Sequence, residues 1–367
     1  MIWLALPALA AAAYFLLAIF AALRWRQPAR ASGSLPAVSI LKPMHGTDPR
    51  LYEAIRSHAA QDYPEFEILF GFGDASDAAI ADVERLKREF PESSLRVVVA
   101  KADAPNAKVG VLAALAKQAR HGLLVVSDDD ILAGPGYLRS VVAPFANTKT
   151  GLVTCLYRAR AQSLPSLVEA LGIATEFAPS VMVARLLGVV DFALGSTMAL
   201  RAETLREIGG FEALADFLAD DYQLGKQVAA RGYRIEFASA VVETGGGAVA
   251  WAAVWKHQLR WSRTIRVSRT AGYYGSVVTQ ATFWALVACA AGQWPVGAAA
   301  LALRVVAGLL VGGVILKDPQ VWHWFWLMPL RDLFGFAVWL GGCFGSTVYW
   351  RGRKLRLRRD GKITQSS

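Results

Sequence analysis

The sequence predicts an α/β domain with a mostly parallel, Rossmann-like β-sheet, enclosed by membrane segments near both ends of the chain. Hydrophobic residues make up 54% of the 367 residues and charged residues only 19%, which is too apolar for an ordinary soluble protein. The apolar residues concentrate at the two ends, whereas residues 36–245 have the mixed composition of a globular domain. Strand-like and helix-like segments alternate within that region, as they do in parallel sheets covered by helices.

The first apolar run covers residues 2–23, carries no charge and is long enough to cross a bilayer. Arg24, Arg26 and Arg30 follow it, whereas a signal peptide would carry its positive charge in front. We therefore expect an uncleaved membrane anchor over residues 1–24, a linker over residues 25–36, and a cytoplasmic position for the domain after the linker.

The central region, residues 37–245, shows the alternation in order along the chain. Short apolar runs predict strands, and segments with helical periodicity predict the helices between them. The expected strands cover residues 38–41, 67–70, 95–100 and 122–127, and the expected helices cover residues 49–60, 80–89 and 109–119. In such sheets ligands bind beyond the carboxyl ends of the strands, so the residues directly after each strand are the first candidates for a site.

The C-terminal region, residues 275–350, is apolar again, with candidate spans near 276–291, 294–316 and 332–350. Three crossings would place the basic tail, residues 351–367, outside, against the preference of basic residues for the cytoplasmic side. The aromatic segment 322–327 is therefore expected to be interfacial or re-entrant, with the tail in the cytoplasm. The number of crossings stays open.

The net charge of +10 is not a sign of nucleic-acid binding, because much of it lies beside apolar spans. Basic residues in that position fit membrane topology and anionic lipid headgroups, and the sequence contains no recognised nucleic-acid module. Cys155, Cys289 and Cys343 show no CxxC spacing and are expected to be reduced, buried thiols.

The strongest motif is an apolar strand that runs directly into Asp128, Asp129 and Asp130. Carboxylates so close together repel one another unless a cation or hydrogen-bond donors offset their charge. Mg²⁺ or Mn²⁺ takes oxygen ligands and shares them with substrate phosphates, so a metal and diphosphate site is expected here. A solvated acidic turn is the alternative.

A second acidic motif, Asp74 and Asp77 after Gly71-Phe72-Gly73, also lies directly after a strand. Glycine lets the backbone approach a ligand, and an aspartate can accept hydrogen bonds from a ribose or a base. One of the two aspartates is expected to bind the nucleotide. The alternative is a helix N-cap formed by Ser76 or Asp77.

A third acidic motif contains Asp220 and Asp221, shortly after the turn at Gly209-Gly210. Glycosyl transfer with inversion needs a carboxylate that removes the proton of the acceptor hydroxyl. We favour Asp221 as this base, while Asp220 could instead cap the next helix.

The fourth motif is His257-Gln258-Leu259-Arg260-Trp261, in an amphipathic segment over residues 246–274. Arg260 can bind diphosphate oxygens, and Trp261 offers a flat face to a sugar or an acceptor. A basic amphipathic helix lying on the membrane is the competing interpretation, and both can hold.

These four motifs, in this order, resemble the ceramide glucosyltransferase family and its bacterial relatives that glycosylate hopanoids. The likeness extends from residue 38 to about residue 270. Its supporting landmarks are Ile40-Leu41-Lys42-Pro43, Gln61-Asp62-Tyr63-Pro64, Asn106-Ala107-Lys108, Gly151-Leu152-Val153 and Gly209-Gly210-Phe211. The resemblance implies a GT-A nucleotide-sugar fold, a UDP-sugar donor, a divalent metal and inversion at the anomeric carbon.

The resemblance also implies roles for individual residues. Asp128 and Asp130 correspond to the DxD pair that faces metal and diphosphate, and Asp221 corresponds to the catalytic base. On the donor side it implies Asp74 or Asp77 beside the uridine, Lys108 near the donor, and Arg260 with Trp261 as the end of a (Gln/Arg)xxRW motif. His257 departs from that motif, because it stands where the family has Gln or Arg.

The expected function is therefore transfer of a sugar, UDP-glucose being the first choice of donor, to the hydroxyl of a membrane lipid such as ceramide. The expected location is a multi-pass position in a bacterial inner membrane, with the catalytic domain facing the cytoplasm. The alternatives are a hopanoid glycosyltransferase that uses UDP-N-acetylglucosamine, a processive polysaccharide synthase, and a membrane nucleotide-sugar sensor or transporter. Intramembrane charges would mark the last class, and Arg304 and Arg331-Asp332 are its candidates.

Overall fold

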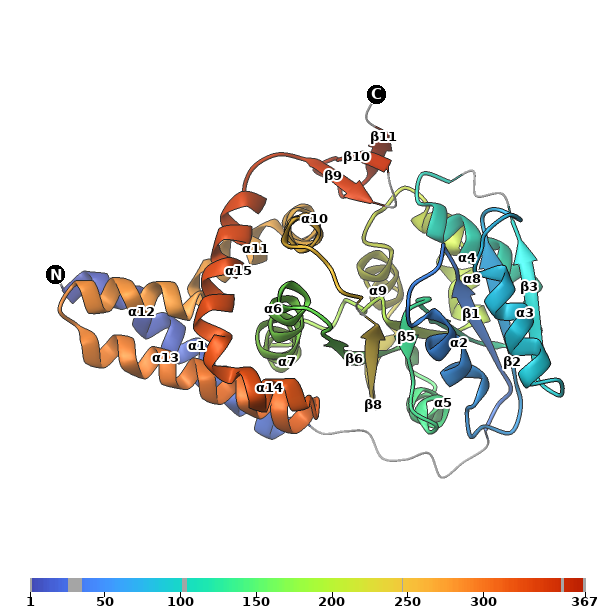
Figure 1. The fold of residues 1–367 in the computed structure, drawn as a ribbon, viewed down its shortest axis with the longest axis horizontal. Coiled ribbons are helices and arrows are strands. Elements are labelled where there is room, and N and C mark those ends of the chain that lie inside the picture. The colour runs from blue at the N-terminus through green and yellow to red at the C-terminus, as the bar shows by residue number, and fades with distance from the viewer. Residues whose placement is uncertain (1, 26–34, 101–103, 246, 351–352, 366–367) are drawn as a thin grey trace.

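The computed structural model describes residues 2–25, 35–100, 104–245, 247–350 and 353–365 (Figure 1). Arg26, Arg30 and most of the expected linker lie outside the described residues. Figure 1 shows a sheet domain on one side, a group of long helices projecting from the other, and shorter helices between the two.

The centre of the sheet domain is an eight-stranded sheet in the order β3-β2-β1-β4-β7-β6-β8-β5. Its first four strands are parallel, β7 runs antiparallel to both β4 and β6, and β8 runs parallel to β6. The strands are β1 (Val38–Pro43), β2 (Phe66–Phe72), β3 (Ser94–Val99), β4 (Leu123–Ser127), β5 (Ile131–Leu132), β6 (Thr150–Arg160), β7 (Thr197–Arg201) and β8 (Arg234–Gly245). The expected mixed α/β fold with a parallel half is confirmed.

The strands β1 and β4 form continuous apolar runs because both faces of the sheet are covered. Successive side chains of a strand point to opposite faces. Ile40 and Val125 accordingly belong to one buried cluster, and their neighbours Leu41 and Val126 belong to another. Such double burial explains why the runs do not alternate between polar and apolar residues.

The helices of this half agree closely with the predicted ones. The helix α2 covers Leu51–Ala59, α3 covers Ile80–Glu89 and α4 covers Ala107–Gln118. The remaining helices of the domain are α5 (Tyr137–Val142), α8 (Ala202–Glu207) and α9 (Asp220–Ala230). The first turns of α4 and α9 and the loops after β2 and β4 carry most of the predicted site residues.

Three helices form the projecting group, namely α1 (Leu6–Arg24), α12 (Ala281–Ala290) and α13 (Trp294–Gly308). The stretches Trp3–Arg24 and Trp294–Ile315 are long and apolar enough to cross a membrane. Large apolar side chains on these helices are exposed, as expected for surfaces that face lipid; they include Leu9, Leu16, Phe20, Leu23, Leu286 and Val306.

A third stretch of suitable length and composition, Leu164–Leu186, was not predicted. It consists of α6 (Leu164–Gly172), the π-helical η3 (Ile173–Phe177) and α7 (Ala178–Leu186). Figure 1 shows α6 and α7 nearly end-on, whereas α1 and α13 lie lengthwise. Because 72% of the most apolar part of this stretch is buried inside the protein, we attribute its high apolar content to packing between the sheet domain and the projecting helices.

The C-terminal region differs from the prediction at its last candidate span. The expected span 332–350 is not one helix, because α15 (Met328–Gly342) is followed by the strand β9 (Thr347–Trp350). The segment α14 (Pro319–Trp324) with η7 (Phe325–Leu327) exposes several aromatic side chains, in agreement with an interfacial element.

Residues 353–365, expected as a basic tail, instead form two strands. The strands β10 (Arg353–Leu357) and β11 (Ile363–Gln365) complete an antiparallel sheet with β9. Leu355 and Leu357 are buried against Leu218, while Lys354, Arg356 and Arg358, which alternate with them, are exposed. The run of basic residues concealed this alternation with a period of two, which is typical of a half-buried strand.

A buried ion pair joins the projecting helices to α15. The guanidinium of Arg304 on α13 lies 2.7 Å from a carboxylate oxygen of Asp332. Thr282 donates a hydrogen bond of 2.7 Å to the same carboxylate, and Arg304 donates one of 3.1 Å to Thr175. Of the charges predicted from the sequence as marks of a transporter, Arg304 and Asp332 therefore neutralise one another, and Arg331 pairs with Glu176 at 3.0 Å.

Replacing Asp332 by Leu is expected to destabilise the protein strongly, because an unpaired buried charge costs about 3–5 kcal/mol. The double variant Arg304→Met, Asp332→Leu leaves no buried charge and is expected to recover most of that loss. Thermal unfolding in detergent micelles measures both. A double variant no more stable than the single one would contradict the assigned role of the pair.

Candidate active site

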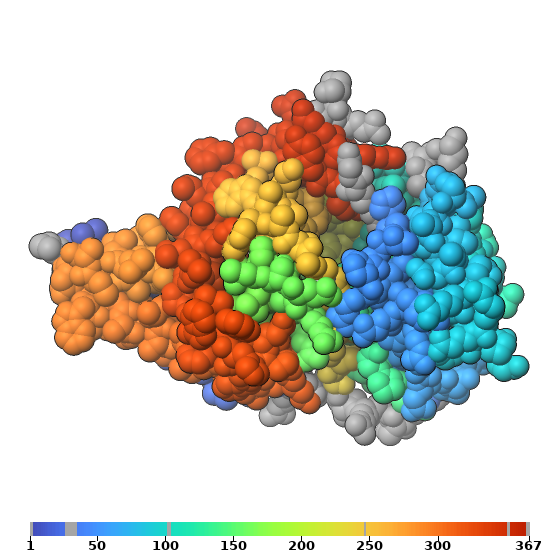
Figure 2. All heavy atoms as spheres, in the orientation of Figure 1, coloured from blue at the N-terminus to red at the C-terminus, as the bar shows by residue number. Residues whose placement is uncertain are grey.

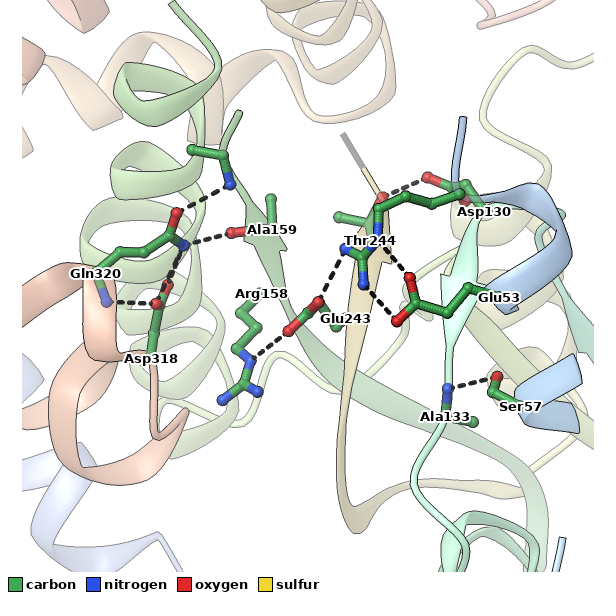
Figure 3. A network of polar contacts seen from close by, with 12 residues as sticks. Glu53, Ser57, Asp130, Ala133, Arg158, Ala159, Glu243, Thr244, Asp318 and Gln320 are labelled. Atoms are coloured by element: carbon green, nitrogen blue, oxygen red, sulfur yellow. Dashed lines mark hydrogen bonds and ion pairs between the residues drawn. The ribbon is translucent and has the colours of Figure 1, made fainter. Parts of the chain in front are cut away.

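The three carboxylates after β4 point in different directions, which answers the problem of their mutual repulsion. Asp128 forms an ion pair of 2.6 Å with the Nζ of Lys108. Asp129 accepts a hydrogen bond of 3.2 Å from the backbone N–H of His45. Asp130 accepts a hydrogen bond from the hydroxyl of Thr244 on β8, as Figure 3 shows. Each carboxylate is thus held by a different part of the chain.

A buried lysine that was not predicted as a site residue lies beneath this acidic run. The Nζ of Lys42 on β1 donates a hydrogen bond of 2.7 Å to the backbone carbonyl of Asp128. Its burial lowers the pKa of Lys42 to about 8, and the nearby aspartates act against this shift. The available signal was a charged residue inside the apolar run Ile40-Leu41-Lys42-Pro43.

The carboxyl of Asp130 lies against Thr244 and is shielded from water. Burial, with the charges of Asp129 and Asp128 as the next causes, raises the pKa of Asp130 to about 7. No group of three metal-binding side chains occurs among the described residues. Mg²⁺ commonly takes only one or two carboxylates and completes its shell with phosphates and water. The carboxylate of Asp128, one third exposed, fits that arrangement, and the assignment of Asp128 and Asp130 as ligands remains a prediction.

The start of α4 is fastened to the loop in front of α9. The side chain of Asn106 accepts a hydrogen bond of 3.3 Å from Val109 and donates one of 2.8 Å to the carbonyl of Phe217. This arrangement places Lys108 between Asp128 and Asp220, whose Oδ2 lies 3.5 Å from its Nζ. Although burial acts in the opposite direction, these carboxylates raise the pKa of Lys108, so it is a fixed cation.

Asp220 and Asp221 form the first turn of α9, and Ala219 is the N-cap without a side-chain cap bond. The capping alternative for Asp220 is therefore not observed. Asp221 approaches Gly195 so closely that a β-carbon there would lie 3.1 Å from its Oδ2. Burial, with the charge of Asp220, raises the pKa of Asp221 to about 6, while Lys108 opposes the shift. A base that acts near neutral pH needs a pKa in this range.

The two aspartates after β2 differ in their surroundings. Asp74 is exposed and accepts two hydrogen bonds of 2.8 Å from Ser76, which lower the pKa of its carboxyl. Asp77 accepts hydrogen bonds from Gly46, at 2.9 Å, and from Ala79, at 3.0 Å. Asp77 therefore fastens two loops together. The alternative N-cap by Ser76 or Asp77 is not observed, because the N-cap of α3 is Ala79, without a side-chain cap bond. Asp74 is the more accessible candidate for the nucleotide.

The fourth motif lies on α10 (Trp251–Ser268). The guanidinium of Arg260 has no hydrogen bond or ion pair to another residue within the described ranges. Burial lowers the pKa of Arg260, whereas Asp221, Glu169 and Asp128 raise it, which places this cation in their field. Trp261 packs against Phe177 with ring centroids 6.5 Å apart. Arg260 is thus available for an anionic ligand.

His257, which stands where the (Gln/Arg)xxRW motif has Gln or Arg, makes contacts that explain its presence. Its Nδ1 lies 2.6 Å from Oε1 of Glu169, and the side chain of Gln258 donates a hydrogen bond of 2.9 Å to the same oxygen. The histidine therefore joins α10 to α6. Glu169 was missed in the sequence, although a lone carboxylate in an apolar helix was a usable signal.

Tyr157 on β6 was missed as well. Its ring packs on Phe177 at a centroid distance of 5.6 Å. Burial raises the pKa of Tyr157, and Asp221, Glu169 and Asp130 raise it further, so its hydroxyl lies in the field of the same group of carboxylates. Nothing in the local sequence distinguishes this tyrosine from a core residue.

Comparison with known proteins gives a consistent result. The family model described as Glycosyl transferase family 21 matches residues 1–363. Ceramide glucosyltransferase 1 of Caenorhabditis elegans is 31% identical over 202 residues, 54% of this chain and 43% of that protein. Ceramide glucosyltransferase 3 of the same organism is 27% identical over 219 residues, 59% of this chain and 48% of that protein. The chain thus spans about half the length of the curated relatives it matches.

Among solved structures, a mannosyltransferase from Pyrobaculum calidifontis, in complex with GDP-Man and Mn²⁺, superposes with a TM-score of 0.56. The superposition covers 93% of this chain and 99% of the other, at 20% sequence identity. At this identity the likeness shows the fold alone, and it confirms the expected nucleotide-sugar transferase fold.

The pKa of Asp130 predicts how stability depends on pH. Its folded-state pKa lies above the ordinary value of about 4, so this carboxyl contributes stability below pH 4 that is lost as the pH rises to about 7. Asp130→Asn, which keeps an acceptor for Thr244, is expected to be the more stable protein above pH 7, by up to about 4 kcal/mol. Thermal unfolding with EDTA between pH 5 and 8 measures the difference, and Asp82→Asn on α3 is the control. Parallel curves for both variants would contradict this prediction.

Proposed function

Because this chain belongs to glycosyl transferase family 21, we propose that it transfers a sugar from a UDP-sugar, UDP-glucose in the first place, to the hydroxyl of a membrane lipid such as ceramide. The observation that carries the proposal is the ion pair of Lys108 with Asp128 at the carboxyl end of β4, next to Asp220 and Asp221, with Arg260, unpartnered among the described residues, in the field of the same carboxylates. These cations and carboxylates suit a diphosphate, a metal and a hydroxyl that must lose its proton.

The donor diphosphate is assigned to the side of the site that contains Lys108, Asp128 and Arg260. Arg260 lacks a partner in the described structure, and its fork of donors matches phosphate oxygens. A divalent metal, Mg²⁺ or Mn²⁺, held by Asp128 with Asp130, would neutralise charge on the departing UDP. The similar mannosyltransferase, solved with GDP-Man and Mn²⁺, accords with such a metal. On this side of the site, Asp74 is the better candidate than Asp77 for the uridine.

Asp221 is assigned as the base. Its carboxylate takes the proton from the lipid hydroxyl, whose oxygen forms a bond to the anomeric carbon. The bond between that carbon and the diphosphate oxygen breaks on the opposite face, and the electron pair leaves with UDP. Attack opposite the leaving group inverts the anomeric centre, so an α-linked donor gives a β-linked product.

The membrane position of the acceptor fits the arrangement of the helices. We assign residues 1–24 and 275–342 to the membrane region and the sheet domain, residues 37–245, to the cytoplasmic side. The expected membrane region 275–350 is shortened because β9 belongs to the small sheet that packs against Leu218. Exposed apolar residues on α1 and α13 and the aromatic residues of α14 support this assignment. The segment 246–274, which carries Arg260, then lies at the interface where a lipid headgroup is accessible.

Purified protein in detergent is expected to release UDP from UDP-glucose when ceramide and Mn²⁺ are both present, and to lose this activity with EDTA. A coupled assay for UDP and mass spectrometry of the lipid product measure the reaction. Parallel reactions with UDP-N-acetylglucosamine and with a hopanoid polyol test the alternative substrates. Absence of release with every pair would contradict a transferase and favour the sensor.

Asp221→Asn is expected to lower kcat by at least about 100-fold, since a general base contributes roughly that much or more. Its KM for the UDP-sugar should change little, because the base contacts the acceptor. Asp220→Asn serves as the neighbouring comparison and should leave more of the activity. The assignment fails if Asp221→Asn turns over normally.

The pH dependence is set by the pKa of Asp221, which lies at about 6 in the folded protein. The base must be ionised, so kcat/KM is expected to fall as the pH drops below about 6 and to level off above it. Initial rates between pH 5 and 8 at saturating metal measure the profile. A rate that rises on acidification would show that another group limits the reaction.

A further inference from the structure

Polar side chains that the proposed chemistry does not use gather between β6, α6 and α15. They are Tyr157, Glu169 and Arg331, on three segments far apart in the sequence. Figure 2 shows that α6 reaches the surface between α10 and α15 on this face of the molecule. The group lies between the candidate catalytic carboxylates and the projecting apolar helices, where the head of a membrane lipid would meet the sugar.

The hydroxyl of Tyr157 is the member closest to the chemistry. Its ring is fixed by Phe177, and it also packs against Ala159, Ala170 and Ile173 beside Trp261. The described residues provide no hydrogen bond to its hydroxyl, and the charges of Asp221 and Glu169 are near enough to raise its pKa further than burial alone. A fixed phenol without a partner, beside a candidate base, is suited to hold a hydroxyl of the substrate.

Only one of the two carboxylate oxygens of Glu169 has hydrogen-bond partners among the described residues. Its Oε1 accepts from both Gln258 and the imidazole of His257, while no partner for Oε2 occurs in the parts of the chain that the structure describes. The side chain is 16% exposed, so the second oxygen is shielded but not enclosed. It can accept a hydrogen bond from a hydroxyl or an amide of a bound molecule.

Arg331 on α15 is the third member and the most deeply buried, at 5% exposure. One of its nitrogens pairs with Glu176 at 3.0 Å, but within the described ranges Nε and Nη1 have no hydrogen-bond partner. The guanidinium fits between two glycines: a β-carbon at Gly172 would lie 2.2 Å from Nε, and one at Gly335 would lie 2.4 Å from Nη1. Gly172 is one turn of α6 beyond Glu169, so the two charged groups are neighbours.

Unpartnered buried donors are costly, at about 1–3 kcal/mol each. A site built to bind polar groups of a substrate leaves such donors without partners until the substrate arrives. Arg331 has two such donors, and the Tyr157 hydroxyl and Oε2 of Glu169 add two polar atoms without a hydrogen-bond partner among the described residues. Together with the nearby aromatic rings of Phe177 and Trp261, they are more than packing requires.

We propose that the polar head of the lipid acceptor binds beside Tyr157, Glu169 and Arg331, a region called the seam below. Tyr157 and Glu169 hold the reacting hydroxyl near Asp221, and Arg331 donates a hydrogen bond to a second oxygen of the head. The ligand class is a lipid that carries a hydroxyl and, a few bonds away, an amide carbonyl or a second hydroxyl. The inference rests on the proposed function and adds to it the place and the chemistry of acceptor recognition.

Two acceptors in detergent micelles test the role of Arg331: ceramide, which has the second oxygen, and octadecanol, which lacks it. Arg331→Met is expected to lower kcat/KM for ceramide about tenfold, the loss of roughly 1.4 kcal/mol of hydrogen bonding, and to change the octadecanol reaction little. A purely structural role would lower both reactions equally, and that result would overturn the proposal. Arg331→Lys, which retains a donor, is expected to recover part of the ceramide reaction.

Tyr157→Phe tests the other end of the seam, with Tyr52→Phe on α2 as the matched control. The first variant is expected to raise the KM for ceramide about tenfold with an unchanged Kd for UDP and Mn²⁺, measured by calorimetry, and the control should change neither. An unchanged KM, or a Kd that weakens in parallel, would overturn the proposal. The unmodified protein distinguishes failure of the proposed function from failure of the acceptor site. If it transfers sugar to no acceptor, the proposed function is contradicted. If it transfers sugar normally and the variants are unaffected, only the acceptor-binding role of the seam is contradicted.

Discussion

The ion pair between Lys108 and Asp128 is the contact on which the arrangement of the candidate site depends. It joins the start of α4 to the end of β4, and the same ammonium reaches Asp220 at the start of α9. Asn106, next but one in the sequence, fastens α4 to the loop in front of α9 through the carbonyl of Phe217. The start of α4, the end of β4 and the start of α9 are therefore fixed by two adjacent anchors, and Asp221 is placed as a result.

The sheet domain was predictable because its strands are buried on both faces and its helices on one, so each type of element left its own pattern in the sequence. The helix α6 and the strand β10 were harder to predict from the sequence. The composition of α6 suggests a membrane helix, and that of β10 suggests a solvent-exposed basic tail. Local sequence also identified the acidic motifs. It could not identify Tyr157, because what distinguishes this residue is burial beside charges that only the folded chain brings together.

The sheet domain and the helical region are joined by polar contacts and not by apolar packing alone. Arg158 on β6 donates to the carbonyl of Leu316, and Gln320 on α14 bonds to the backbone of Ala159 and Ala161 on the adjoining strand end and loop. Figure 3 shows that Arg158 also contacts Glu243, next to Thr244, which holds Asp130. The position of the acidic run is thus connected to the turn that enters α14. Because hydrogen bonds are directional, this connection sets orientation as well as proximity.

The small C-terminal sheet supports two parts of the site together. The N–H of Ile363 donates to the carbonyl of Asp216, just before α9, while Arg263 on α10 donates to the carbonyls of Phe344 and Thr347. These supporting strands come after the membrane region in the sequence. During synthesis on a ribosome, the loop before Asp220 and the helix that carries Arg260 therefore gain their last contacts only after the apolar helices have been made. The order of translation thus delays completion of the site until the helices that anchor it are available for insertion.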